Sequence, residues 1–80
     1  MYYVYILQSI NFPDQSYVGY TEDIHNRLVK HNNGSTVHTN KYKPWKIVTS
    51  IAFADKVKAI AFEEYLKSGS GRVFKNKRLL

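Results

Sequence analysis

The segment from Tyr2 to Gln8 alternates its side chains as a β-strand does. Large apolar or aromatic groups occupy both of its faces, with Tyr3, Tyr5 and Leu7 on one and Tyr2, Val4 and Ile6 on the other. Both faces therefore need to be covered by other parts of the protein. We expect this strand to lie at the centre of its sheet.

A second strand, Tyr17 to Thr21, follows a turn of Asn, Pro and Asp residues within positions 11–15. Proline fixes φ in such turns, and Asn and Asp side chains bond to their own backbone. The two segments therefore predict a β-hairpin. Tyr5 and Tyr17 share a face only in pairing registers where the numbers of paired residues add to an even sum, and the sequence leaves that register open.

An amphipathic helix is predicted directly after the hairpin. Thr21 is the expected N-cap, and acidic residues follow it in the first turn. The helix is expected to run to about Asn33 and to end at Gly34. Ile24 and Leu28 mark its buried stripe.

Arg27 and His31 lie one helical turn apart on the flank of that stripe. A solvated arginine would normally lie on the opposite side of the helix. We therefore expect both side chains to point along the edge of the sheet, toward the hairpin.

Residues 35–45 have no hydrophobic period, which indicates a loop. The strand pattern returns over residues 46–53, which predict a third strand. Its apolar residues fall on two sides: Ile47, Ile51 and Phe53 on one, Val48 and Ala52 on the other.

Two helices are predicted after this strand. Asp55 is expected to cap a helix over about residues 56–68, and the Ser-Gly-Ser-Gly sequence at 68–71 is expected to break it. Residues 72–80 predict a short, basic terminal helix. The order of elements predicts an α+β fold, with a small β-sheet flanked by two to three α-helices.

Composition narrows the class of protein. The 80 residues suffice for one domain, expected over 1–80, and the absence of cysteine leaves only oxygen or imidazole as metal ligands. Twelve Lys and Arg against six Asp and Glu give a net charge of +6, and 15% of residues are aromatic. This balance favours nucleic acid as a partner. No apolar stretch could span a membrane and no signal-peptide pattern is present, so we expect a soluble, cytoplasmic protein.

Candidate chemistry gathers where the hairpin meets the helices. Each residue alone has a simpler interpretation, because strand tyrosines usually pack and helix carboxylates beside lysines usually face solvent. Together, the residues match a metal-assisted phosphodiester site: Tyr5 and Tyr17 on the strands, Arg27 and His31 on the first helix, and a carboxylate on the second helix. The guanidinium suits a phosphate, a phenol beside cations can take a proton from water, and a carboxylate suits Mg²⁺.

The spacing of these residues resembles the GIY-YIG nuclease domain. The motif residues are Tyr3-Val4-Tyr5, then Tyr17-Val18-Gly19 after eleven intervening residues, Arg27 on the next helix and Glu63 after the third strand. The likeness extends over nearly the whole chain. It is strongest to small stand-alone bacterial proteins similar to the N-terminal nuclease domain of the excinuclease C subunit, through residues 44–46 (Pro-Trp-Lys) and 67–72 (Lys-Ser-Gly-Ser-Gly-Arg).

The resemblance implies a three-stranded antiparallel sheet and a role for each motif residue. Glu63 would hold a single Mg²⁺ or Mn²⁺ ion, and Tyr17 would be the general base that activates water. Tyr5 would orient the phosphate, Arg27 would stabilise its charge, and His31 matches a position near the scissile phosphate. Gly19 would allow backbone and substrate to approach closely. A helical wheel instead places Glu64 nearer an apolar stripe, so both glutamates remain candidate metal ligands.

Three functions follow from these observations. The first is a divalent-metal-dependent DNA endonuclease of low intrinsic sequence specificity, acting in DNA repair or recombination. The second is a nucleic-acid-binding module of the same fold with little catalysis. The third is an interaction domain that a protein partner targets. The first two would use the same basic surface, for which the candidate DNA-binding residues are Lys41, Lys43, Lys46, Arg72, Lys75 and Asn76.

Overall fold

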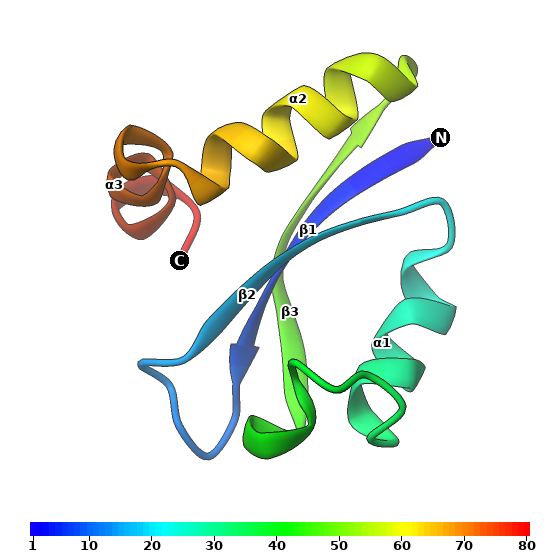
Figure 1. Ribbon diagram of the computed structural model, residues 1–80, viewed down its shortest axis with the longest axis vertical. Helices are drawn as coiled ribbons and strands as arrows, with labels where there is room; N and C mark the ends of the chain where they lie inside the picture. Colours follow the sequence, from blue (N-terminus) through cyan, green and yellow to red (C-terminus); the bar gives the residue numbers. More distant parts are fainter.

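Strand β1 (Tyr2–Ser9) lies at the centre of a three-stranded antiparallel sheet, between β2 (Ser16–Thr21) and β3 (Trp45–Phe53). The computed structural model describes residues 1–80. Helix α1 (Ile24–Asn32) and a short 3₁₀ turn, η1 (Asn40–Tyr42), separate β2 from β3, and α2 (Lys56–Lys67) and α3 (Gly69–Arg78) follow (Figure 1). The α+β class and the central position of β1 are confirmed.

The register of the hairpin decides which tyrosines share a face. Tyr5 pairs with Gly19, and Leu7 pairs with Tyr17. The paired numbers add to an even sum, so Tyr5 and Tyr17 lie on the same face of the sheet, as the site requires. The opposite face carries Val4 and the other even-numbered residues of β1.

Both faces of β1 are buried because helices cover the sheet on both sides. On one face, Val4 and Ile6 pack with Ala59 and Leu66 of α2. On the other face, Tyr5, Leu7 and Trp45 form a second cluster, which Ile24 and Leu28 of α1 cover. Figure 1 shows α1 on one side of the sheet and α2 with α3 on the other. The predicted buried stripe of α1 is confirmed.

A β-bulge in the pairing of β1 with β3 changes the faces of β3. Ile6 pairs with Thr49, whereas Leu7 pairs with Ile47, so one residue of β3 is skipped. Ile47 therefore packs with the Tyr5 cluster, while Phe53 packs with the Val4 cluster. The prediction that Ile47 and Phe53 share a side is wrong, because strict alternation fails across a bulge.

The first turn of α1 is capped by Asp23, whose side chain accepts a hydrogen bond from the Asn26 backbone N–H at 3.1 Å. Thr21, the predicted N-cap, still belongs to β2 and instead hydrogen-bonds with the Asp23 backbone. The cap prediction is therefore wrong by two residues (21 against 23). Asp23 has both a suitable side chain and an extended backbone, which are the requirements of an N-cap.

Ser68 both ends α2 and begins α3. Its hydroxyl oxygen accepts a hydrogen bond from the Gly71 N–H at 3.3 Å. A Cβ at position 71 would overlap the backbone of Tyr65, so only glycine allows the two helices to meet this closely. Helix α3 accordingly begins at Gly69, and the prediction that it begins at residue 72 is wrong.

The helices are short. Helix α1 has 9 residues, α2 has 12 and α3 has 10. None combines the length and the apolar character that crossing a bilayer would require.

Candidate functional site

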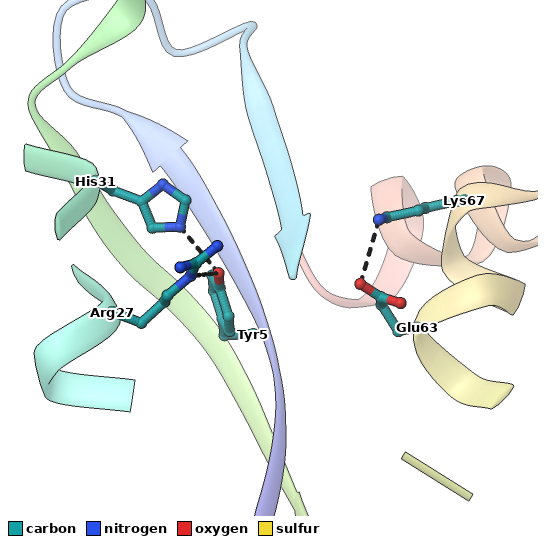
Figure 2. A network of polar contacts seen from close by, with 5 residues as sticks. All are labelled: Tyr5, Arg27, His31, Glu63 and Lys67. Carbon is teal, nitrogen blue, oxygen red and sulfur yellow. Dashed lines mark hydrogen bonds and ion pairs between the residues drawn. The ribbon is translucent and has the colours of Figure 1, made fainter. Parts of the chain in front are cut away.

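The hydroxyl of Tyr5 is contacted by two other side chains of the site. It lies 2.9 Å from Nε2 of His31 and accepts a hydrogen bond from Nε of Arg27 at 3.4 Å (Figure 2). The one-turn spacing of Arg27 and His31 on α1 presents both side chains to the same phenol. Three of the predicted catalytic residues are therefore in direct contact.

Tyr17 adds its ring to this cluster. The centroid of its ring lies 5.1 Å from that of His31 and 6.4 Å from that of Tyr5. Tyr17 is half-buried, whereas Tyr5 is only 1% exposed. Tyr17 is therefore the phenol that water and a substrate can reach.

Gly19 makes the position of Tyr5 possible. The two residues pair across the hairpin, and the Tyr5 ring lies over the place where a side chain at position 19 would stand. A Cβ there would overlap the phenol ring. In the structure, the group that approaches the Gly19 backbone closely is thus the Tyr5 ring.

The electrostatic environment keeps Tyr5 and His31 uncharged. Burial raises the pKa of the Tyr5 phenol; the Arg27 hydrogen bond opposes this effect, and the charges of Tyr17 and Glu63 add to it. Burial, and then the charge of Arg27, lower the pKa of His31. The hydrogen bond to Tyr5 raises the pKa of Arg27. Near neutral pH the cluster therefore contains one permanent positive charge, on Arg27.

Thr39 is a member of the site that sequence reasoning missed. Its hydroxyl oxygen lies 2.7 Å from Nδ1 of His31, and both residues are completely buried. Thr39 stands in the stretch without periodicity between α1 and β3. A buried hydroxyl in such a stretch leaves no sequence pattern, because nothing in the spacing tells it apart from the neighbouring threonines.

Glu63 lies on the far side of β2 from this cluster. Figure 2 shows Glu63 and Lys67 on one side of β2, and Tyr5, Arg27 and His31 on the other. Lys67 Nζ and a carboxylate oxygen of Glu63 form an ion pair at 3.2 Å. Glu63 makes no hydrogen bond to the cluster, but its charge contributes to the raised pKa of Tyr5.

The two candidate glutamates differ in their surroundings. Glu63 shares its side of α2 with Ala59 and Leu66, which are both completely buried, and its side chain is only 19% exposed. Glu64 points to solvent. The helical wheel that placed Glu64 nearer an apolar stripe is therefore wrong, because the buried residues of α2 are Ala59 and Leu66, and Glu63 lies on their side of the helix whereas Glu64 does not.

A divalent ion held by this carboxylate would depend on few protein ligands. The protein has no cluster of three or more His, Cys, Asp or Glu side chains. Asp23 and Asp55 are occupied as helix caps. Mg²⁺ keeps several of its waters and often binds through one or two carboxylates together with substrate phosphates, so the partly buried Glu63 fits such an ion.

The basic residues proposed to bind DNA form two groups. Lys41 and Lys43 lie in the segment that joins α1 to β3, Lys46 is the second residue of β3, and all three are exposed. Lys41 Nζ lies 5.3 Å from the centre of the Tyr42 ring. Tyr42 packs against the Tyr5 cluster, so Lys41 and Lys43 lie on the same side of the sheet as α1. Lys46 pairs with Gln8, so its side chain lies on the opposite face, which carries Val4.

The second group is on α3, on the opposite side of the sheet. Arg72 and Asn76 are exposed, while Lys75 is half-buried and donates a hydrogen bond to the Ser16 hydroxyl at 3.3 Å. Burial, and then the charge of Arg72, lower the pKa of Lys75. The fold therefore does not present one continuous basic surface.

Comparisons with known proteins place this arrangement in a family. The family model of the GIY-YIG catalytic domain matches residues 1–78. The structure-specific endonuclease subunit SLX1 of Candida dubliniensis is 37% identical over 73 residues, which cover 82% of this chain and 26% of that protein. The UPF0213 protein YsiG of Lactococcus lactis is 36% identical over 67 residues, which cover 82% of this chain and 62% of that protein.

A solved structure is similar over a larger share of the chain. The solution NMR structure of the UPF0213 protein BH0048 from Bacillus halodurans has a TM-score of 0.56 and 31% sequence identity, and the match covers 96% of this chain and 84% of that chain. By contrast, the chain spans about a quarter of the Candida relative and less than two thirds of the Lactococcus relative. From the family model and the shared fold together, this chain belongs to the GIY-YIG catalytic-domain family.

Proposed function

We propose that the chain is a DNA endonuclease domain that hydrolyses phosphodiester bonds with a divalent metal ion and has low intrinsic sequence specificity. The observation that carries this proposal is the hydrogen bond between Nε of Arg27 and the Tyr5 hydroxyl. This bond fixes the guanidinium while its terminal nitrogens stay available for two hydrogen bonds to a phosphate. Arg27 is half-buried, so a phosphate at the surface can reach it.

In this proposal the two tyrosines have different roles. Tyr17, as the phenolate, takes the proton from the attacking water and becomes the neutral phenol, because it is the phenol that solvent reaches. Tyr5 is buried and positions Arg27, which stabilises the negative charge that develops on the phosphate. Glu63 would hold Mg²⁺ or Mn²⁺, and the ion would supply further neutralisation of phosphate charge.

The basic residues would hold the DNA backbone around this site. The lysines at 41 and 43 lie on the side of the sheet that carries Tyr5 and Tyr17, which favours them over Lys46 and the α3 group as the first contacts with a cleaved strand. Phosphate contacts position a protein without reading sequence. Low sequence specificity follows, and we propose that the domain acts in the cytoplasm in DNA repair or recombination.

One observation favours a second candidate function. The carboxylate of Glu63 is paired with Lys67, away from the Tyr5 cluster, and this pairing suits a nucleic-acid-binding module that does not turn over. A protein partner is a related possibility, because the Candida relative is named as a subunit. Targeting by a partner would supply the substrate choice that a small domain lacks.

The adjacent glutamates of α2 provide a matched test. Purified protein is incubated with duplex, flapped and branched DNA, with and without Mg²⁺ or Mn²⁺. Glu63→Gln and Glu64→Gln each remove one negative charge, at neighbouring positions of which the first is half-buried and the second is exposed. We expect metal-dependent nicks from the wild type and from Glu64→Gln, and none from Glu63→Gln. DNA binding that survives both substitutions, with no cleavage by the wild type, would establish the binding module instead.

A further inference from the structure

A buried chain of hydrogen bonds runs from Tyr5 through His31 to Thr39. Tyr5 is 1% exposed, and His31 and Thr39 are 0% exposed. We infer that Thr39 is a positioning residue that fixes the ring tautomer of His31 and, through it, the direction of the Tyr5 hydroxyl. The inference rests on the proposed function, because it explains how Arg27 is held for a phosphate.

The tautomer follows from counting donors and acceptors. The Tyr5 oxygen accepts a hydrogen bond from Arg27, which can only donate. The Tyr5 proton also needs an acceptor, and within this buried site the available one is Nε2 of His31, at 2.9 Å. Nε2 is then unprotonated, so the neutral ring carries its proton on Nδ1.

Thr39 is the group that can accept this Nδ1 proton. The Nδ1 to Oγ1 distance is 2.7 Å. The Thr39 hydroxyl in turn donates to the carbonyl of Thr36, at a longer distance of 3.5 Å. Every donor in this series of hydrogen bonds then has an acceptor, and each residue donates to the next one from Tyr5 to Thr36. The second ring nitrogen of a functional histidine commonly sets the tautomer in this way.

Thr39 is itself held in place by groups from α1 and β3. The indole Nε1 of Trp45 donates to the Thr39 carbonyl at 2.8 Å. The Asn32 side chain then binds both the N–H and the carbonyl of Trp45, at 2.6 and 3.1 Å. A threonine whose backbone is held in this way is suited to orient a ring, because its backbone cannot follow that ring if it turns.

The opposite tautomer would disturb the arginine. With its proton on Nε2, His31 would donate to the Tyr5 oxygen, to which Arg27 also donates. The Tyr5 proton would then point away from His31 and would lack an acceptor in a buried position. Arg27 and His31 would then compete as donors for the same Tyr5 oxygen, which would weaken the hydrogen bond that holds Arg27. Thr39 therefore acts on the phosphate-binding residue through two intermediates and without touching the substrate.

The test is a ¹⁵N NMR measurement of the imidazole nitrogens in the wild type, Thr39→Val and Thr39→Ser. Valine keeps the shape of threonine and removes the acceptor, whereas serine keeps the hydroxyl. His25 and His38 are exposed and serve as internal references that exchange between tautomers. We expect His31 to carry its proton on Nδ1 in the wild type and in Thr39→Ser, and to shift toward the Nε2 form in Thr39→Val. A wild-type proton on Nε2, or an unchanged tautomer in Thr39→Val, would overturn the inference.

Cleavage assays connect the tautomer to function. Thr39→Val is expected to slow single-turnover cleavage on the order of tenfold, the lower end of the loss seen when a metal-bound histidine loses its orienting partner, and Thr39→Ser to restore the rate. If the tautomer changes as expected but no variant, wild type included, cuts DNA, the proposed function fails and the positioning role stands. If the wild type cuts DNA and Thr39→Val retains the wild-type tautomer, the positioning role fails. Should Thr39→Val not fold, the wild-type and Thr39→Ser spectra still decide the tautomer.

Discussion

The Tyr5 hydroxyl and Nε2 of His31 lie 2.9 Å apart, although 26 positions separate the two residues in the chain. The contact joins the central strand to the first helix at the one point where Arg27 also meets the phenol. Because Tyr5 is buried and carries a raised pKa, it serves here as a neutral hydrogen-bonding group. Its removal should therefore be felt both in the stability of the fold and in the site.

The first prediction concerns Tyr5→Phe. The substitution keeps the ring and removes the hydroxyl, which leaves the buried Nε2 of His31 without its donor. The free energy of unfolding should fall by about 1–3 kcal/mol, the usual cost of an unsatisfied buried polar group. Cleavage should fall as well, because Arg27 loses its support. Urea unfolding and single-turnover assays measure the two effects, and a variant with wild-type stability would contradict the hydrogen-bond geometry.

The second prediction concerns Gly19→Ala. The added methyl group would overlap the Tyr5 ring, so the ring must move or the hairpin must shift. Overpacking of this kind costs about 1–3 kcal/mol. Gly69→Ala is the matched control, because a Cβ at position 69 meets nothing within 4 Å. Thermal unfolding of the two variants should separate them, with Gly19→Ala destabilised and Gly69→Ala unchanged or slightly stabilised; equal effects would count against the close packing of Gly19 and Tyr5.

The third prediction is a pH dependence of stability that belongs to His31. Its pKa is lowered in the folded protein, mainly by burial and then by Arg27, so the unfolded chain binds the proton more readily. Stability should be full above the unfolded pKa, about 6.5, and should decline as the pH falls from there toward the folded pKa. Denaturant unfolding between these pH values measures the decline. His31→Gln should lose this component, whereas His25→Gln, at an exposed position, should retain it.

The fourth prediction separates the two basic groups. If the lysines near η1 contact DNA phosphates, the double variant Lys41→Gln, Lys43→Gln should weaken binding to all DNA sequences alike. The slope of log K against log salt should become shallower by about 0.9 for each phosphate that the double variant no longer neutralises. Lys56→Gln, at the exposed start of α2, is the control and should leave the slope unchanged. A salt slope unaffected by the double variant would point instead to the α3 group.

The sequence predicts the parts of the fold that depend on local patterns. Alternation on both faces identified β1 as the central strand, and the one-turn spacing of Arg27 and His31 placed both beside Tyr5. The hairpin register could not be predicted, because a shift of one residue would have preserved most of the pattern while turning Tyr5 away from Tyr17.

The remaining differences arise from long-range contacts. The β-bulge that moves Ile47 to the other face of β3 depends on pairing with β1, which the local sequence of β3 does not encode. The start of α3 depends on how closely Gly71 can approach the turn that ends α2. Thr39 joins the site only because Trp45 and Asn32 fold the intervening loop back onto α1.

Glu63 and the Tyr5 cluster lie on two sides of β2, and the proposed function requires both to belong to one metal-dependent site. A crystal soaked in Mn²⁺ tests this requirement, because anomalous scattering locates the ion. We predict that the Glu63 carboxylate leaves Lys67 and binds Mn²⁺, and that the bound ion lies within reach of Tyr17 and Arg27. A crystal in which Glu63 remains paired with Lys67 and Mn²⁺ is absent from its carboxylate would contradict the proposed site.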